Sequence, residues 1–119
     1  MAENKQYITH DQEFGTLLIS DDVVGAIVVS SLKDVEGVIG IGGKLGFDLA
    51  SIKNWAKALR ISITEGNTVT IDCNIIVAYG QSVIQVAKNA QDAITAAVES
   101  MTGVKPAAVN VNVSGISRQ

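Results

Sequence analysis

The fold is decided by residues 69–103, which read VTIDCNIIVAYGQSVIQVAKNAQDAITAAVESMTG. Over residues 69–79, apolar and polar side chains alternate with a period of two, which predicts a strand with one buried face. The second part carries an apolar stripe at helical spacing. Ser82 and Gln85 form a capping-box pair before it, and Gly103 ends it. A strand followed by a long amphipathic helix therefore forms the centre of the fold.

Further strands are predicted on both sides of this strand and helix. Apolar side chains alternate with polar ones over residues 59–64, and the glycine-containing turn at residues 65–67 joins this segment to the strand at 69–79. A turn this short between two alternating segments favours a β-hairpin. Valine alternates with asparagine over residues 109–113, which predicts the last strand, again with one apolar face.

The N-terminal half adds a second main helix. A short strand is predicted over residues 16–20, and Ser20 precedes two aspartates that suit the first turn of a helix. Apolar side chains at helical spacing extend this helix over residues 21–34, and Gly37 supplies its C-terminal stop. A short apolar strand over residues 38–42 follows.

These elements predict an α+β fold. A short helix beginning at Asp48 completes the order β-α-β-short α-β-β-α-β. Because the sheet is apolar on one face only, we expect a two-layer sandwich, a mixed sheet of about five short strands with the two main helices on one face. This single domain is expected over residues 14–119. Residues 1–13, which have few large apolar side chains, are expected to form a flexible N-terminal arm.

The composition fits one compact domain and argues against several classes of protein. The chain has 119 residues, of which 47% are hydrophobic and 18% charged. Its net charge of −3 disfavours a general nucleic-acid binder, because neutralising phosphates requires a basic surface. The sequence predicts no transmembrane segment, and its polar start does not resemble a secretory signal. Together with the single cysteine, this predicts a cytoplasmic protein.

Residues that could carry out catalysis or bind a metal are few in the sequence. His10 is the single histidine, and Cys73, the single cysteine, falls on the apolar face of the central strand. A Cys/His catalytic pair or a zinc site therefore lacks its partners, and Cys73 is predicted to be a core residue. Asp72 and Glu65, a conceivable acid/base pair, fall on a solvated sheet face and in a turn. We therefore predict no catalytic residues, no metal, no cofactor and no enzymatic activity.

A glycine-rich segment begins within the predicted strand at residues 38–42. Its glycines are candidate ligands of a phosphate or another anion, and they are Gly40, Gly42, Gly43 and Gly46. The dinucleotide-binding spacing would require glycine at position 45, where this chain has Leu45, and the sequence contains no P-loop motif. A flexible loop that binds no ligand is the alternative interpretation.

Positive charge is concentrated between residues 43 and 64. This segment has four basic side chains against one acidic side chain, and it includes the single tryptophan. The candidate partner-binding residues are Lys44, Lys53, Trp55, Lys57 and Arg60. Segregated charge of this kind can mark a contact surface. In the alternative interpretation, Trp55 packs on the sheet edge and the lysines simply face water.

Several motifs occur in a specific order along the chain. They are GTLLISDDVV at 15–24, VEGV at 35–38, VTID at 69–72 with IIVAYG at 75–80, SMTGV at 100–104 and VNVNV at 109–113. This ordered set resembles the alkaline shock protein family of mainly Gram-positive bacteria, whose members are also called general stress or envelope stress response proteins. The resemblance implies a non-enzymatic cytoplasmic protein, held near the membrane by a partner in some members and tied to regulation of fatty-acid synthesis in others. The sequence departs from the family pattern around residues 43–58.

The predicted function is a non-enzymatic cytoplasmic stress-response scaffold or regulatory protein that acts through protein-protein contacts. Its expected partner is a protein, with a membrane protein of the cell envelope as one candidate, and not a nucleic acid. The alternative is a small-molecule or anion-binding regulatory module that uses the loop from Gly40 to Gly46. Because strands at sheet edges can pair between chains, a homo-oligomer is also predicted.

Overall fold

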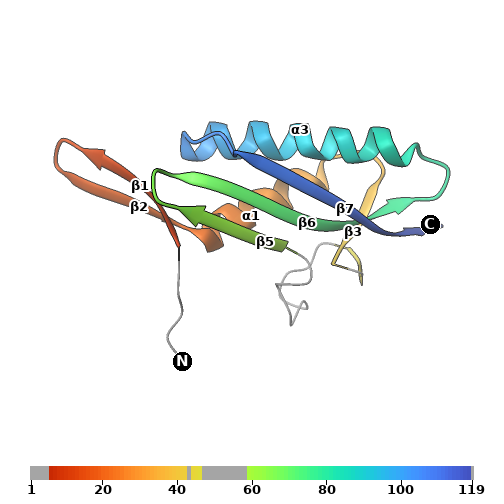
Figure 1. The fold of residues 1–119 in the computed structure, drawn as a ribbon. Coiled ribbons are helices and arrows are strands. Elements are labelled where there is room, and N and C mark those ends of the chain that lie inside the picture. Colours follow the sequence, from red (N-terminus) through yellow and green to blue (C-terminus); the bar gives the residue numbers. More distant parts are fainter. Residues whose placement is uncertain (1–5, 43, 47–58, 119) are drawn as a thin grey trace, which may run out of the picture.

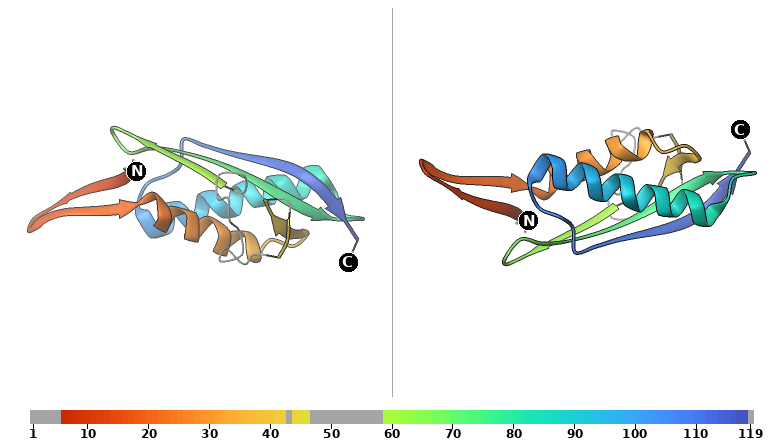
Figure 2. Two further views of the ribbon diagram at one scale, coloured as in Figure 1. Left: turned by 90° about the horizontal axis from the view of Figure 1, so that it is seen from below. Right: turned by 90° about the horizontal axis from the view of Figure 1, so that it is seen from above.

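The structure is a computed structural model that describes residues 6–42, 44–46 and 59–118. Its elements in chain order are β1 (Tyr7–Gln12), β2 (Gly15–Ser20), α1 (Asp21–Lys33), β3 (Val38–Ile41), β4 (Lys44–Leu45), β5 (Leu59–Thr64), β6 (Thr68–Ala78), α3 (Val83–Thr102) and β7 (Ala108–Ser117). Figures 1 and 2 show a sheet layered against two helices, with a separate hairpin of β1 and β2 at one end. The predicted α+β sandwich is therefore confirmed.

Strand β6 is the central strand of the five-stranded sheet. It pairs antiparallel with β5 along residues 68–73, antiparallel with β3 along residues 75–77, and parallel with β7 along residues 70–78. One edge of a strand bonds only one neighbour at each position, so β3 and β5 lie end to end along one edge of β6 and β7 occupies the other. The sheet is mixed, as the sequence predicts.

Helices α1 and α3 cover the same face of this sheet (Figure 2). Ser20 and Ser82 cap the two helices, each accepting a hydrogen bond from a backbone N–H of the first turn. The capping box of α3 is only half formed, because the side-chain Nε2 of Gln85 donates to Asn89 Oδ1 at 2.9 Å. Gly103, with a φ of +78°, ends α3 in the left-handed conformation that glycine adopts without strain.

The core lies between the sheet and the two helices. Its largest fully buried side chains include Ile8, Leu32, Ile41, Ile71, Ile75 and Ile94. Burying one such side chain contributes about 1.5–3 kcal/mol. Cys73 is 1% exposed and belongs to the same cluster, which confirms its prediction as a core residue.

The N-terminal residues differ from the prediction. The sequence predicts a flexible arm over residues 1–13, but Tyr7–Gln12 form β1 and pair antiparallel with β2. The prediction is wrong for this segment because β1 obtains its stability from distant residues: its single fully buried side chain, Ile8, joins the core of the sandwich. Residues 1–5 lie outside the described residues. The assignment of one domain to residues 14–119 stays a prediction.

Two further segments depart from the sequence-based expectation. The last strand runs over Ala108–Ser117, longer than the predicted 109–113, and the two-residue strand β4 pairs with β3 where a loop is predicted. The predicted short helix that begins at Asp48 lies outside the described residues.

Candidate functional site

The β1–β2 hairpin extends beyond the sandwich and is here called the arm, residues 7–20 (Figures 1 and 2). Phe14 lies in the turn at its tip and is 96% exposed. In strand β2, Leu17 and Leu18 are 45% and 55% exposed. Because successive side chains of a strand lie on opposite faces, the arm presents a leucine on each of its two faces.

This arrangement is unusual for a hairpin that serves only the stability of its own chain. Two strands by themselves are marginally stable in water, and they normally gain stability by packing an apolar face. The arm buries Ile8 but leaves Phe14 and two leucines at least 45% exposed. Three exposed apolar side chains on one short hairpin are candidates for contact with another protein. The arm is therefore the first candidate site.

The base of the arm is fixed to the sandwich through side chains. The carboxamide of Asn67, in the β5–β6 turn, bonds both backbone groups of Thr9: Asn67 Oδ1 accepts from Thr9 N–H and Asn67 Nδ2 donates to the Thr9 carbonyl, each at 2.9 Å. His10 Nε2 lies 2.7 Å from the carbonyl oxygen of Thr102, and because a carbonyl only accepts, the histidine donates. The arm is thus anchored at its base and exposed at its tip.

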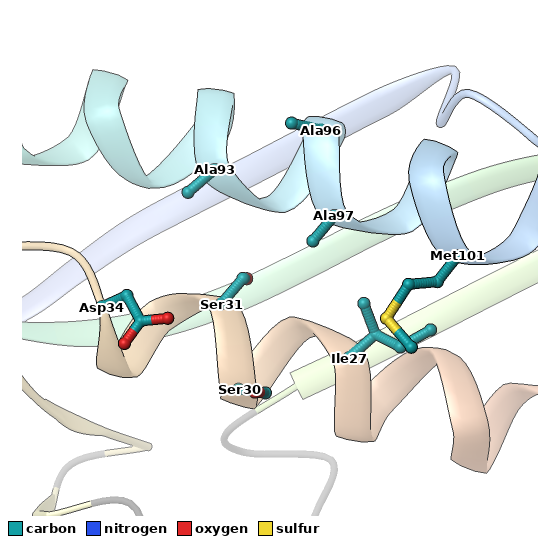
Figure 3. Close-up of a pocket in the computed structure, with 8 residues that line it drawn as sticks. All are labelled: Ile27, Ser30, Ser31, Asp34, Ala93, Ala96, Ala97 and Met101. Atoms are coloured by element: carbon teal, nitrogen blue, oxygen red, sulfur yellow. The ribbon is translucent and has the colours of Figure 1, made fainter.

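A groove runs between the two helices on the surface away from the sheet (Figure 3). Its volume is about 400 Å³, and its lining consists of Ile27, Ser30, Ser31, Asp34, Ala93, Ala96, Ala97 and Met101. Met101 is 69% exposed at one end of the groove, beside Ile27. The lining is mostly alanine on α3 and serine on α1, with Asp34 as its one charged side chain. The groove therefore offers few groups that could bind a ligand.

The open face of the sheet is polar and hydrogen-bonded within itself. Arg60, Asp72 and Asn110 are neighbours in the strand register, and Asn110 Nδ2 donates to Asp72 Oδ1 at 2.8 Å. Arg60 is exposed on this face, and Lys44 lies in β4. The other three members of the predicted partner-binding group, Lys53, Trp55 and Lys57, lie outside the described residues, so that group stays a prediction.

The glycine-rich segment uses several of its backbone groups within the protein. Gly40 forms part of β3, the N–H of Gly42 donates to the Asn74 carbonyl, and the N–H of Gly46 donates to the Ile39 carbonyl, both at 2.9 Å. An anion cradle requires free backbone N–H groups, and these two already have acceptors. Gly43 lies outside the described residues. No observation therefore adds support to the anion-binding alternative, which stays a prediction.

The side chains that could support other chemistry are dispersed. Burial, reinforced by the adjacent Asp72 carboxylate, raises the pKa of the Cys73 thiol to about 12, so this thiol is protonated at neutral pH. Within residues 6–42, 44–46 and 59–118, no three His, Cys, Asp or Glu side chains gather closely enough to hold a metal ion. None of the described helices combines the length and apolar character needed to cross a membrane.

The β1–β2 hairpin differs from the flexible chain predicted for residues 1–13. The signal that could have located it is the pair of short segments at 7–12 and 15–20, which are separated by only two residues, a spacing typical of a hairpin. The first of these segments has only Tyr7 and Ile8 as large apolar side chains, so its strand pattern is weak.

Comparisons with known proteins identify relatives along nearly the whole chain. Residues 9–118 match the alkaline shock protein 23 family, which is described as having a cell envelope-related function. Among individual proteins, the uncharacterized protein Spy1614 of Streptococcus pyogenes is 29% identical over 107 residues, covering 86% of this chain and 88% of its own length. The uncharacterized protein YloU of Bacillus subtilis is 26% identical over 109 residues, covering 87% and 90%. A second Streptococcus pyogenes protein, Spy1535, is 31% identical over 102 residues, covering 86% and 79%.

Solved structures with the same fold include variants of the MamM CTD. The zinc form of one variant is 20% identical to this chain, with a TM-score of 0.51 and coverage of 80% of this chain and 85% of that one. Another variant is 21% identical, with a TM-score of 0.50 and coverage of 80% and 94%. At this identity the likeness describes the fold alone.

Proposed function

We propose that this chain, which belongs to the alkaline shock protein family, is a non-enzymatic cytoplasmic protein of the stress-response type. It scaffolds or regulates by binding another protein at the cell envelope. The family description names a cell envelope-related function. The finer statement, that this function is carried out through protein-protein contacts, is our proposal.

The observation that carries the proposal is the exposed tip of the arm. Phe14, at 96% exposed, projects from a hairpin whose base is held by hydrogen bonds to Asn67 and Thr102. An anchored base reduces the entropy lost when the tip is immobilised in a complex. Aromatic side chains that enter a partner's pocket often supply much of the binding energy of an interface.

The chemistry of the arm also indicates what its partner offers. Asp11 and Glu13 are exposed beside Phe14, so the apolar tip has acidic neighbours. A complementary partner has an apolar pocket with a basic rim, because opposite charges around an interface guide association and exclude wrong partners. We expect this partner to be a protein of the envelope, with a protein that regulates fatty-acid synthesis as the second candidate.

Site-specific cross-linking tests this proposal. A photoreactive residue in place of Phe14 is expected to form an adduct with one protein in living cells, whereas the same residue in place of Ile84, which is 82% exposed in α3, is expected not to form that adduct. Leu18→Ser, added to the Phe14 probe, should remove the adduct because it removes apolar contact area on the same arm.

Two outcomes would contradict the proposal. One is an adduct of the same protein from both probe positions, which would indicate non-specific proximity. The other is an unchanged adduct in the Leu18→Ser background, since an arm that binds through its apolar side chains cannot lose one of them without effect.

A further inference from the structure

The β5 edge and the β7 edge of the five-stranded sheet differ in how far their backbone groups are covered and in their charge. At the β5 edge, the Gln6 side chain accepts a hydrogen bond from the backbone N–H of Ile63, and Asn67 joins the β5–β6 turn to β1. Strand β5 also carries the charged Arg60. A covered backbone and a charged side chain are the usual means by which proteins prevent an edge strand from pairing with another chain.

Strand β7 has less of this protection: its register with β6 shifts once, between Val113 and Gly115. It pairs with β6 along one side, and among the described residues no other strand lies against it (Figure 1). Its ten residues, AVNVNVSGIS over Ala108–Ser117, contain no charged residue and no proline. The Val109 carbonyl accepts from Gln91 Nε2 at 3.0 Å, which covers one backbone group near the start of the strand. A long, neutral edge strand of this composition favours pairing with a further strand.

The side chains of β7 are suited to a neighbour of the same kind. Val109, Val111 and Val113 remain only partly buried on the helix face, while Asn110 and Asn112 are exposed on the open face. A strand beside β7 with valine on the helix face would bury these valines further. Asparagine on the open face of that second strand would extend the row of polar side chains formed by Asn110 and Asn112.

We propose that β7 pairs antiparallel with β7 of a second copy of this chain, about a two-fold axis near Asn112, so that two sheets join into one. In such a pair the residue on the two-fold axis faces its own copy, which is unfavourable for a charged residue and acceptable for a neutral one such as Asn112. Strand β7 contains no charged residue and so meets this condition at any position of the axis, whereas β5 contains Arg60. The proposal concerns the opposite edge from the arm and goes beyond the proposed function.

Charge substitution at the axis is the direct test. In Asn112→Lys, two lysines would face each other across the axis, and in Asn112→Glu two glutamates would. We expect sedimentation velocity to show a dimer of the wild-type protein and a dimer dissociation constant about fivefold higher or more for either variant. An equimolar mixture of the two variants should restore the dimer, because opposite charges then meet.

A matched control separates edge pairing from stacking of the open faces. Thr64→Lys adds the same charge to the same face on β5, where Thr64 is exposed, and should leave the dimer unchanged. Circular dichroism and melting temperature establish that each variant folds. A wild-type protein that stays monomeric to high micromolar concentration would overturn the proposal, as would an equal loss of dimer in Thr64→Lys.

Cysteine cross-linking provides a second measurement that does not depend on added charge. Opposed residues of an antiparallel pair have Cα atoms about 4.5–5.5 Å apart, within the range of a disulfide. Asn112→Cys is therefore expected to form a covalent dimer under mild oxidation. The native Cys73 is 1% exposed and does not compete. If Asn112→Cys stays monomeric while the same substitution at Thr64 cross-links, the second strand is not β7 of another copy.

Discussion

The sandwich and the arm use the same kinds of residue in opposite ways. In the sandwich, Ile71 and Ile75 of β6 are completely buried, whereas in the arm Leu17 and Leu18 are 45% and 55% exposed. Side chains of equal hydrophobicity thus stabilise the fold in the sandwich and form an exposed surface in the arm. The difference teaches that the buried Ile8 and side-chain hydrogen bonds hold the arm in place, while its exposed apolar side chains are available for contacts outside the monomer.

Truncation of a core residue should give the largest difference between the two regions. Ile75→Ala is expected to lower the free energy of unfolding by about 2–5 kcal/mol, because it removes fully buried atoms and leaves a cavity. Leu18→Ala in the arm should change it by no more than about 0.5 kcal/mol. Urea denaturation measures both. Equal losses of unfolding free energy in the two variants would show that the arm is part of the folding core. The distinction between the arm and the sandwich would then be wrong.

Alkaline pH should act on the sandwich through Cys73. Burial holds the pKa of this thiol at about 12 against 9.0 in an exposed thiol, so the folded state binds its proton more tightly. The resulting stabilisation is complete below pH 9 and is lost as the pH rises toward 12, by about 1.4 kcal/mol for each pH unit in that range.

The variant Cys73→Ala isolates this effect from the titration of other groups. Between about pH 8 and about pH 11, the wild-type protein should lose more stability than Cys73→Ala, measured by urea denaturation at each pH. Parallel pH profiles for the two proteins would mean that the thiol titrates as it does in the unfolded chain.

The smallest of the three effects concerns the joint between the two regions. Asn67 has a φ of +62°, so Asn67→Gly removes the side chain while glycine adopts the same backbone conformation. We expect a loss of about 1–2 kcal/mol for the two hydrogen bonds to Thr9. Hydrogen exchange should become faster at Thr9 and stay unchanged in the centre of β6. Uniformly faster exchange would instead show that the turn supports the whole sheet.

The parts of the fold that could be predicted are those whose pattern repeats over many residues. Strand β6 and helix α3 extend over 11 and 20 residues, and each shows its period several times. The arm could not be predicted in the same way. Its position depends on Asn67 and Thr102, which are 58 and 92 positions away from their partners in β1. Hydrogen bonds across such distances leave no periodic signal in the sequence.

The candidate site was only partly accessible from the sequence for a related reason. Charge segregation is visible in a sequence and led to a five-residue group, of which Lys53, Trp55 and Lys57 lie outside the described residues. Exposure is not visible in a sequence. Leu17 and Leu18 have the same hydrophobicity as core residues, and only the tertiary structure distinguishes them.

The anchoring of β1 has a consequence for protein synthesis. His10 of the arm is synthesised 92 residues before Thr102, whose backbone carbonyl accepts its hydrogen bond. Domains fold during synthesis only when the interacting residues have emerged. The bond from His10 therefore forms only after helix α3 has been synthesised, whereas the bonds between Thr9 and Asn67 can form before it.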